Sequence, residues 1–207
     1  AVHAEAHVRL AGDASTDTAY LDGSAGNETF EARPDYGKLF GTGFAYEAKF
    51  FDQVHATGGG GNDKANFFDN ATANDTFVGW PAVSYMTGTN SRAKPYVNIA
   101  RGAGAFAWPW SRTAPPAFSQ AKAFKTVKAN AHNNVGDRAW LYDSAGADKL
   151  QADRNWVKLY NSTPNYSYLV TAFRRVDAVS NDTTKKNTRT RAATLKLNML
   201  YFSGLWK

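Results

Sequence analysis

The sequence predicts an all-β repeat protein, and three observations lead to that prediction. The first is a block that occurs three times, as DTAYLDGSAGNETFEARPDYGK at residues 17–38, DKANFFDNATANDTFVGWPAVSYM at residues 63–86 and DRAWLYDSAGADKLQADRNWVK at residues 137–158. The second is an aromatic content of 14%, because large flat side chains suit half-buried strand surfaces. The third is a period-two alternation of apolar residues in short segments separated by Gly, Asn and Asp, which is typical of strands joined by tight turns.

Each copy of the first block has the same internal order. It opens with Asp-x-Ala and a short apolar-aromatic run, continues through an Asp and a turn of small residues, and then reaches an apolar residue at Phe30, Phe77 or Leu150. A second block follows each copy and ends in Val-x-Ala, at residues 54–56, 127–129 and 176–178. Val and Ala two positions apart lie on the same face of a strand, so we expect them to point into a core.

The spacing of the blocks defines the expected repeat units. Asp17 and Asp63 are 46 residues apart, whereas Asp63 and Asp137 are 74 apart, and the surplus of 28 falls within residues 88–116. We expect units of about 46 to 50 residues at 17–62, 63–136 and 137–189, with an inserted loop at 88–116. Partial units are expected at both ends of one domain that covers residues 1–207.

Units of this size predict a stacked architecture, because one unit is too small to bury its own apolar face. Two coils of about 22 to 25 residues per unit would build a parallel β-helix, or β-solenoid, with ladders of Ala, Val, Phe and Leu inside. A β-propeller has a similar period but normally needs four or more copies. With about three and a half copies in the chain, we expect the solenoid.

Composition narrows the classes of function. The formal net charge is +6, and the one dense basic cluster is Lys185, Lys186, Arg189 and Arg191. We interpret that cluster as a solvated turn and strand face rather than a polyanion site, and expect no specific nucleic-acid partner. A run of about 18 apolar residues that could span a membrane as a helix is absent from the sequence. Cysteine is absent too, so neither disulfides nor thiolate metal sites contribute.

The repeated blocks carry a family resemblance. LYDSAGADKLQA at residues 141–152, FDNATANDTFVG at 68–79, LDGSAGNETFEA at 21–32 and GGGGND at 58–63 resemble the LYDS-G-D-D-F repeats of large secreted cell-surface proteins common in planctomycete-type bacteria. The resemblance covers about four fifths of the chain and misses residues 88–116. It implies a secreted or surface-located β-solenoid scaffold or adhesin and no known reaction.

A looser likeness links the turns to calcium-binding β-roll repeats, in which Asp carboxylates of Gly-rich turns coordinate Ca²⁺ between coils. The carboxylates in the corresponding positions are Asp69, Asp75, Asp143 and Asp148. The alternative is that these Asp side chains accept hydrogen bonds from turn amides, and we favour it because nothing repeats at nine residues and the glycine pairs are mostly missing. Ca²⁺ is the one cofactor that the sequence suggests.

The expected insert contains a different kind of candidate site. Trp108, Trp110 and Arg112 lie on a Pro-stiffened stretch that interrupts the repeat. Loops on rigid scaffolds often bind ligands, and exposed Trp suits sugar stacking or a protein partner. The same rings could equally fold back against the side of the solenoid.

Six Asn-x-Ser/Thr sequons provide candidate glycosylation sites, at Asn27, Asn70, Asn74, Asn161, Asn165 and Asn181. Several fall in the repeated turns, where Asn beside Ser or Thr is also ordinary turn chemistry. Both interpretations stay open at this point.

The sequence favours a structural function over an enzymatic one. Motifs such as HExxH, GxSxG, the P-loop and the dinucleotide fingerprint do not occur, so no catalytic residue is assigned. We expect an extracellular surface-layer, adhesin or filament component that associates with itself end to end. The alternative is a carbohydrate-binding module or a polysaccharide lyase or hydrolase on a β-helix scaffold, with surface polysaccharide as its partner.

Overall fold

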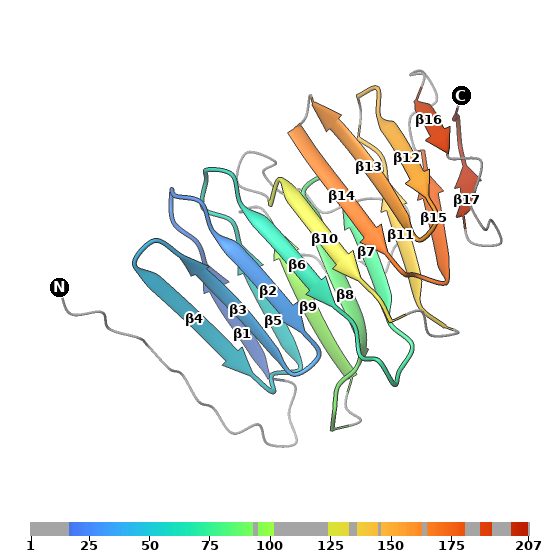
Figure 1. Cartoon of the computed structure of the whole chain (residues 1–207). Coiled ribbons are helices and arrows are strands. Elements are labelled where there is room, and N and C mark those ends of the chain that lie inside the picture. The colour runs from blue at the N-terminus through green and yellow to red at the C-terminus, as the bar shows by residue number, and fades with distance from the viewer. Residues whose placement is uncertain are drawn as a thin grey trace.

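In the computed structural model, the chain forms two large mixed β-sheets that pack face to face (Figure 1). The structure describes residues 17–92, 95–101, 124–132, 136–144, 146–162, 165–180, 187–191 and 200–206. The regular elements in these ranges are all strands, which confirms the all-β prediction. Within the same ranges, no helix has the length and apolar character needed to cross a membrane.

The nine-stranded sheet has the order β16-β12-β13-β14-β10-β6-β2-β3-β4 among the described residues. Its strands are β2 (Thr29–Arg33), β3 (Tyr36–Gly41), β4 (Phe44–Lys49), β6 (Lys64–Phe68), β10 (Thr126–Asn130), β12 (Lys149–Asp153), β13 (Trp156–Ser162), β14 (Asn165–Thr171) and β16 (Thr188–Arg191).

In the described part of the chain, the eight-stranded sheet has the order β1-β5-β9-β8-β7-β11-β15-β17. Its strands are β1 (Thr18–Asp22), β5 (Gln53–Thr57), β7 (Thr76–Trp80), β8 (Val83–Thr89), β9 (Pro95–Arg101), β11 (Arg138–Tyr142), β15 (Arg175–Val179) and β17 (Leu200–Ser203). In Figure 1 the colours run from blue at one end of both sheets to red at the other, so chain order broadly follows the long direction of the stack.

The chain path repeats a five-strand pattern three times. Each repeat begins with a three-stranded antiparallel meander, formed by β2-β3-β4, β7-β8-β9 or β12-β13-β14. The chain then adds one strand to the opposite sheet and one strand to the sheet it has just left. Because the next meander starts in the opposite sheet, the three meanders alternate between the nine-stranded, eight-stranded and nine-stranded sheets.

The antiparallel meanders make both sheets mixed, whereas the sequence predicts parallel coils throughout. The first two strands of every meander are joined by two residues, at 34–35, 81–82 and 154–155, and such short loops form hairpins. The strands that follow each meander pair in parallel with strands of the neighbouring repeats, for example β5 with β9 and β10 with β14. Parallel pairing therefore links the repeats, and antiparallel pairing operates within them.

The core lies between the sheets and is continuous across the repeats. The block residues Phe30, Phe77 and Leu150 are 0 to 1% exposed, and the Val-x-Ala pairs are buried as their period-two spacing predicts. Phe67 connects the first two repeats, because its ring centroid lies 6.0 Å from that of Phe30 and 5.5 Å from that of Phe77. The main core is therefore shared by the repeats, and a smaller apolar cluster lies within the second repeat, formed by Val78, Trp80, Val83, Ile99 and Tyr142.

Part of the range expected as an insert belongs to the regular pattern. β8 extends to Thr89, and Pro95–Arg101 forms β9, which takes the third meander position that β4 and β14 hold in the other repeats. The sequence motif is hard to recognise there because β9 has Asn98 at the position that Tyr46 holds in β4 and Tyr168 in β14. Residues 102–123 lie outside the described ranges.

Candidate metal centre

Three acidic turns connect the sheets just before each meander. We name them the first turn (residues 22–28), the second turn (69–75) and the third turn (143–148). The last residue of each turn donates its backbone N–H to a side chain that precedes a strand of the next parallel layer. These bonds are Glu28 N to Asp63 Oδ1 at 2.8 Å, Asp75 N to Asp137 Oδ1 at 3.1 Å, and Asp148 N to Asn187 Oδ1 at 2.9 Å.

The strand directions place these turns on both long edges of the two-sheet stack. β1 and β11 run the same way in the eight-stranded sheet, so the first and third turns leave that sheet at the same edge. The second turn precedes β7, which runs in the same direction as β1, so it lies at the opposite edge. The three turns are equivalent positions of one repeating pattern, which makes their differences informative.

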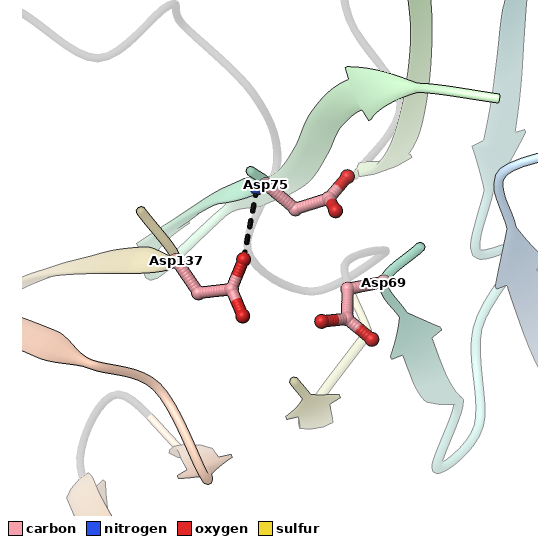
Figure 2. Close-up of side chains that lie close together, drawn as sticks. All are labelled: Asp69, Asp75 and Asp137. Atoms are coloured by element: carbon pink, nitrogen blue, oxygen red, sulfur yellow. Dashed lines mark hydrogen bonds between the residues drawn. The ribbon is translucent and has the colours of Figure 1, made fainter. Parts of the chain in front are cut away.

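The second turn gathers three carboxylates from three segments. Asp69 follows β6, Asp75 precedes β7 and Asp137 precedes β11, and one carboxylate oxygen from each lies within 4.8 Å of the other two (Figure 2). All three are buried, at 5%, 0% and 0% exposure respectively. Asp69 accepts hydrogen bonds from the backbone N–H of His132, at 2.7 Å, and pairs with the ring of the same residue.

This arrangement has the chemistry of a divalent cation site. Three buried carboxylates repel one another when ionised, and a bound cation or a proton relieves that repulsion. Two ligands of one Ca²⁺ ion can lie up to about 5 Å apart, because Ca–O distances are about 2.3–2.6 Å, whereas the limit for Mg²⁺ is about 4.2 Å. The three oxygens of the second turn meet the limit for Ca²⁺.

The first turn contains two buried carboxylate oxygens without a hydrogen-bond partner. Glu28 and Asp63 are 2% and 1% exposed, and neither Glu28 Oε2 nor Asp63 Oδ2 accepts a hydrogen bond from the described residues. Glu28 Oε1 is bonded by the Ser24 hydroxyl. Burial, together with the neighbouring Glu28 carboxylate, raises the pKa of Asp63 to about 6. A buried acceptor without a donor costs free energy, so the first turn is incomplete as a hydrogen-bond network.

The third turn has a complete network made of protein donors. Asp148 accepts hydrogen bonds from the Ser144 hydroxyl at 3.1 Å, from Asn161 Nδ2 at 3.2 Å and from the Tyr166 hydroxyl. Asp143 Oδ2 accepts from Ser180 Oγ at 2.7 Å and from Asn187 Nδ2 at 2.8 Å. Asn187 replaces the third acid by a neutral amide, so this turn holds two carboxylates surrounded by donors.

The structure therefore divides the four predicted calcium ligands into two groups. Asp69 and Asp75 meet in the second turn, whereas Asp143 and Asp148 lie in the hydrogen-bond network of the third. Turn hydrogen bonding, which the sequence favoured for all four, describes the third turn well. Asp137 and the Glu28–Asp63 pair were not predicted as ligands. The sequence contained a signal for these ligands, because Asp recurs at positions 63 and 137, where the second and third copies of the block begin. Each of these residues lies one parallel layer away from the turn to which it contributes.

The other predicted site residues lie elsewhere. Trp108, Trp110, Arg112 and the sequon Asn181 fall outside the described residues. Asn27, Asn74 and Asn165 are exposed, as a glycan requires. Asn161 is 8% exposed and its Nδ2, the atom that would carry a glycan, donates to Ser144 and Asp148, while Asn70 Nδ2 donates to the Thr89 carbonyl at 2.7 Å. The geometry suits glycosylation at the first three sequons and not at these two.

The raised pKa of Asp63 predicts that, in calcium-free buffer, the free energy of unfolding increases as the pH falls. Since the pKa is about 6 in the folded state and near 4 in the unfolded state, the folded protein binds more protons between these values. The free energy of unfolding should therefore increase as the pH falls from 7 to 5, by about 1 kcal/mol from this group.

Thermal unfolding of the chain and of Asp63→Asn, in chelator at pH 7 and pH 5, measures this effect. Asn retains the Oδ1 acceptor for Glu28 N–H, as Asn187 does in the third turn. The variant should be more stable than the natural chain at pH 7 and should lose most of the gain at pH 5. An equal pH response in both proteins would contradict the assignment.

The fold and turns define a class of all-β protein in which two mixed sheets are built from a repeated meander and joined by acidic turns. Comparison with protein-family models, with curated proteins and with solved structures finds no match. The proposal for function accordingly rests on the sheets, their edges and the sequence repeats.

Proposed function

We propose that the chain is a segment of an extracellular structural repeat protein, in which stacked repeats form a β-solenoid and chains associate end to end. The five-strand pattern supports this proposal, because the strands that link successive repeats pair in parallel and extend both sheets in one direction. The ring contacts of Phe67 with Phe30 and Phe77 also support the proposal, because they continue the core from the first repeat into the second. Such a pattern can be continued by adding further repeats without changing its geometry.

The observation that carries the proposal is the direction of the four outermost described strands. In the nine-stranded sheet, β4 at one end and β16 at the other run in the same direction. In the eight-stranded sheet, β1 and β17 also run in the same direction. Moving a second copy along the stack without turning it would therefore bring both pairs of edges together as parallel strands. Such head-to-tail contacts repeat indefinitely and generate filaments.

The end formed by β1 and β4 has the character of an interface. A hollow between these strands is lined by Ala19 and Leu21 from β1 and by Ala48 and Phe51 at the end of β4, together with polar neighbours. Leu21, Ala48 and Phe51 are part of the main core cluster. The core therefore reaches the end of the described sheets at this point, where a further repeat would cover it.

The residues of the blocks support the extracellular part of the proposal. Their resemblance to the repeats of large secreted cell-surface proteins favours export and a scaffold or adhesin role. Exposed sequons at Asn27, Asn74 and Asn165 are compatible with a glycosylated surface. A surface-layer or filament component is the role in which stacking and end-to-end association serve the same purpose.

Sedimentation velocity over a hundredfold range of protein concentration tests end-to-end association. Tyr20 on β1 and Tyr201 on β17 are 63% and 47% exposed on the outermost strands of the eight-stranded sheet. The natural chain should form larger species as concentration rises, and Tyr20→Lys or Tyr201→Lys should reduce association at least tenfold, because charges on edge strands oppose pairing.

The matched control is Tyr160→Lys on β13, a strand with a neighbour on each side. It makes the same chemical change away from the ends and should leave association unchanged. A monomer at all concentrations, or equal loss of association in all three variants, would contradict the proposal.

A further inference from the structure

We propose that the first and second turns each bind one Ca²⁺ ion and that the third turn binds none. In the second turn the carboxylate ligands are Asp69, Asp75 and Asp137, and in the first turn they are Glu28 and Asp63. This inference goes beyond the structural function above and does not depend on it, since a monomeric chain contains both turns.

The geometry of the second turn supports a cation between two parallel layers of strands. Its three carboxylates belong to two successive parallel layers, because β11, which follows Asp137, pairs with β7, which follows Asp75. The oxygens lie within 4.8 Å of one another, a spacing that one Ca²⁺ ion can span. Backbone carbonyls and water would supply the remaining ligands that Ca²⁺ requires.

The unpartnered oxygens of the first turn supply independent evidence for a ligand. Glu28 Oε2 and Asp63 Oδ2 are buried acceptors without a hydrogen-bond donor. Gly23 leaves space beside Glu28 Oε2, since a Cβ built at position 23 would lie 3.0 Å from that oxygen. A cation between the two carboxylates satisfies both oxygens and offsets the repulsion between the charges.

The third turn shows what the same position looks like when the protein supplies the donors itself. Tyr166 and Asn161 donate to Asp148, and Asn187 donates to Asp143. In the first repeat the positions paired across the meander hold Gly41 and Phe44 in place of Asn161 and Tyr166, and neither side chain can donate a hydrogen bond. The first and third turns thus differ in their hydrogen-bond donors because different residues occupy these positions.

Isothermal titration with CaCl₂ after chelator treatment measures the number of sites. The natural chain should bind two Ca²⁺ ions with dissociation constants below about 1 mM, the upper range of extracellular calcium modules. Asp137→Asn should weaken one site at least tenfold, and Asp63→Asn should weaken the other by at least the same factor. Both substitutions keep the Oδ1 acceptor that the turn needs, as Asn187 does naturally.

The control is Asp148→Asn in the third turn, which makes the same change where no ion is expected and should leave two sites. Circular dichroism establishes that each variant is folded before titration, and terbium luminescence, excited through nearby aromatic rings, gives a second count of sites. Absence of binding by the folded natural chain at 10 mM CaCl₂, a concentration of about ten times the expected limit, would overturn the proposal. Weakening or loss of a site in Asp148→Asn, or unchanged affinity of both sites in Asp137→Asn or in Asp63→Asn, would overturn the assignment of ligands.

Discussion

Replacing Phe67 by Ala is expected to lower the free energy of unfolding by about 4 kcal/mol, the usual range for a fully buried Phe being about 3–5 kcal/mol. Phe67 is 0% exposed and its ring contacts Phe30 of the first repeat and Phe77 of the second. Removing the ring leaves a cavity at the boundary between two repeats. Because the repeats share one core, we expect a single cooperative transition at lower denaturant concentration rather than separate unfolding of one repeat.

Denaturant unfolding of the natural chain, Phe67→Ala and Tyr46→Ala measures this effect. Tyr46 lies on the outermost strand β4 and is 37% exposed, so its removal should change the free energy of unfolding by about 0.5 kcal/mol or less. A loss below about 1 kcal/mol for Phe67→Ala would show that the contacts across the repeat boundary do not hold the sheets together.

Gly61→Ala is expected to cost about 3 kcal/mol or more, because two turns approach each other closely at this position. Gly61 has a φ of 67°, and a Cβ there would lie 2.1 Å from the carbonyl oxygen of Gly26. Asn62 N–H donates to Asn27 Oδ1 at 2.7 Å beside this contact, so the turn at 58–63 packs directly on the first turn. Alanine would force the two turns apart and disturb the Glu28–Asp63 pair between them.

Gly43→Ala separates this steric effect from backbone strain. Gly43 has a φ of 85°, also in the left-handed region, but a Cβ there would have no neighbouring atom within 4 Å. It should therefore cost only about 1 kcal/mol. Thermal or denaturant unfolding of both variants gives the difference. Equal losses would mean that the close approach of the turns contributes nothing to stability.

The sequence was sufficient to predict the all-β class and the buried positions named above, because these follow from local patterns. The Val-x-Ala pairs and the apolar residues after the three turns, Phe30, Phe77 and Leu150, are buried. The meander was harder to predict, since its hairpins depend on two-residue turns such as Pro34-Asp35 and Thr42-Gly43. The sequence contains residues typical of turns at these positions, but parallel coils do not include hairpins, in which the chain reverses its direction.

The candidate site was only partly predictable for a related reason. The position of Asp75 in a turn is a local property, whereas its meeting with Asp137, 62 residues away, depends on which strands pair. Once the strands that pair in parallel are known, the repeat spacing predicts that Asp75 and Asp137 lie close together. The distinction between the turns depends on Asn161 and Tyr166, whose proximity to Asp148 follows from the antiparallel pairing of β13 with β14.

Negative-stain electron microscopy of the purified chain at high concentration tests most directly the claim that repeats and chains continue one stack. Eight or nine strands per sheet, spaced at about 4.8 Å, give each chain a length of about 40 Å along the stack. We predict straight rods whose lengths are multiples of about 40 Å and which shorten to single particles in Tyr20→Lys. Uniform compact particles of one chain at all concentrations would contradict end-to-end stacking and leave the repeats as the fold of a monomer.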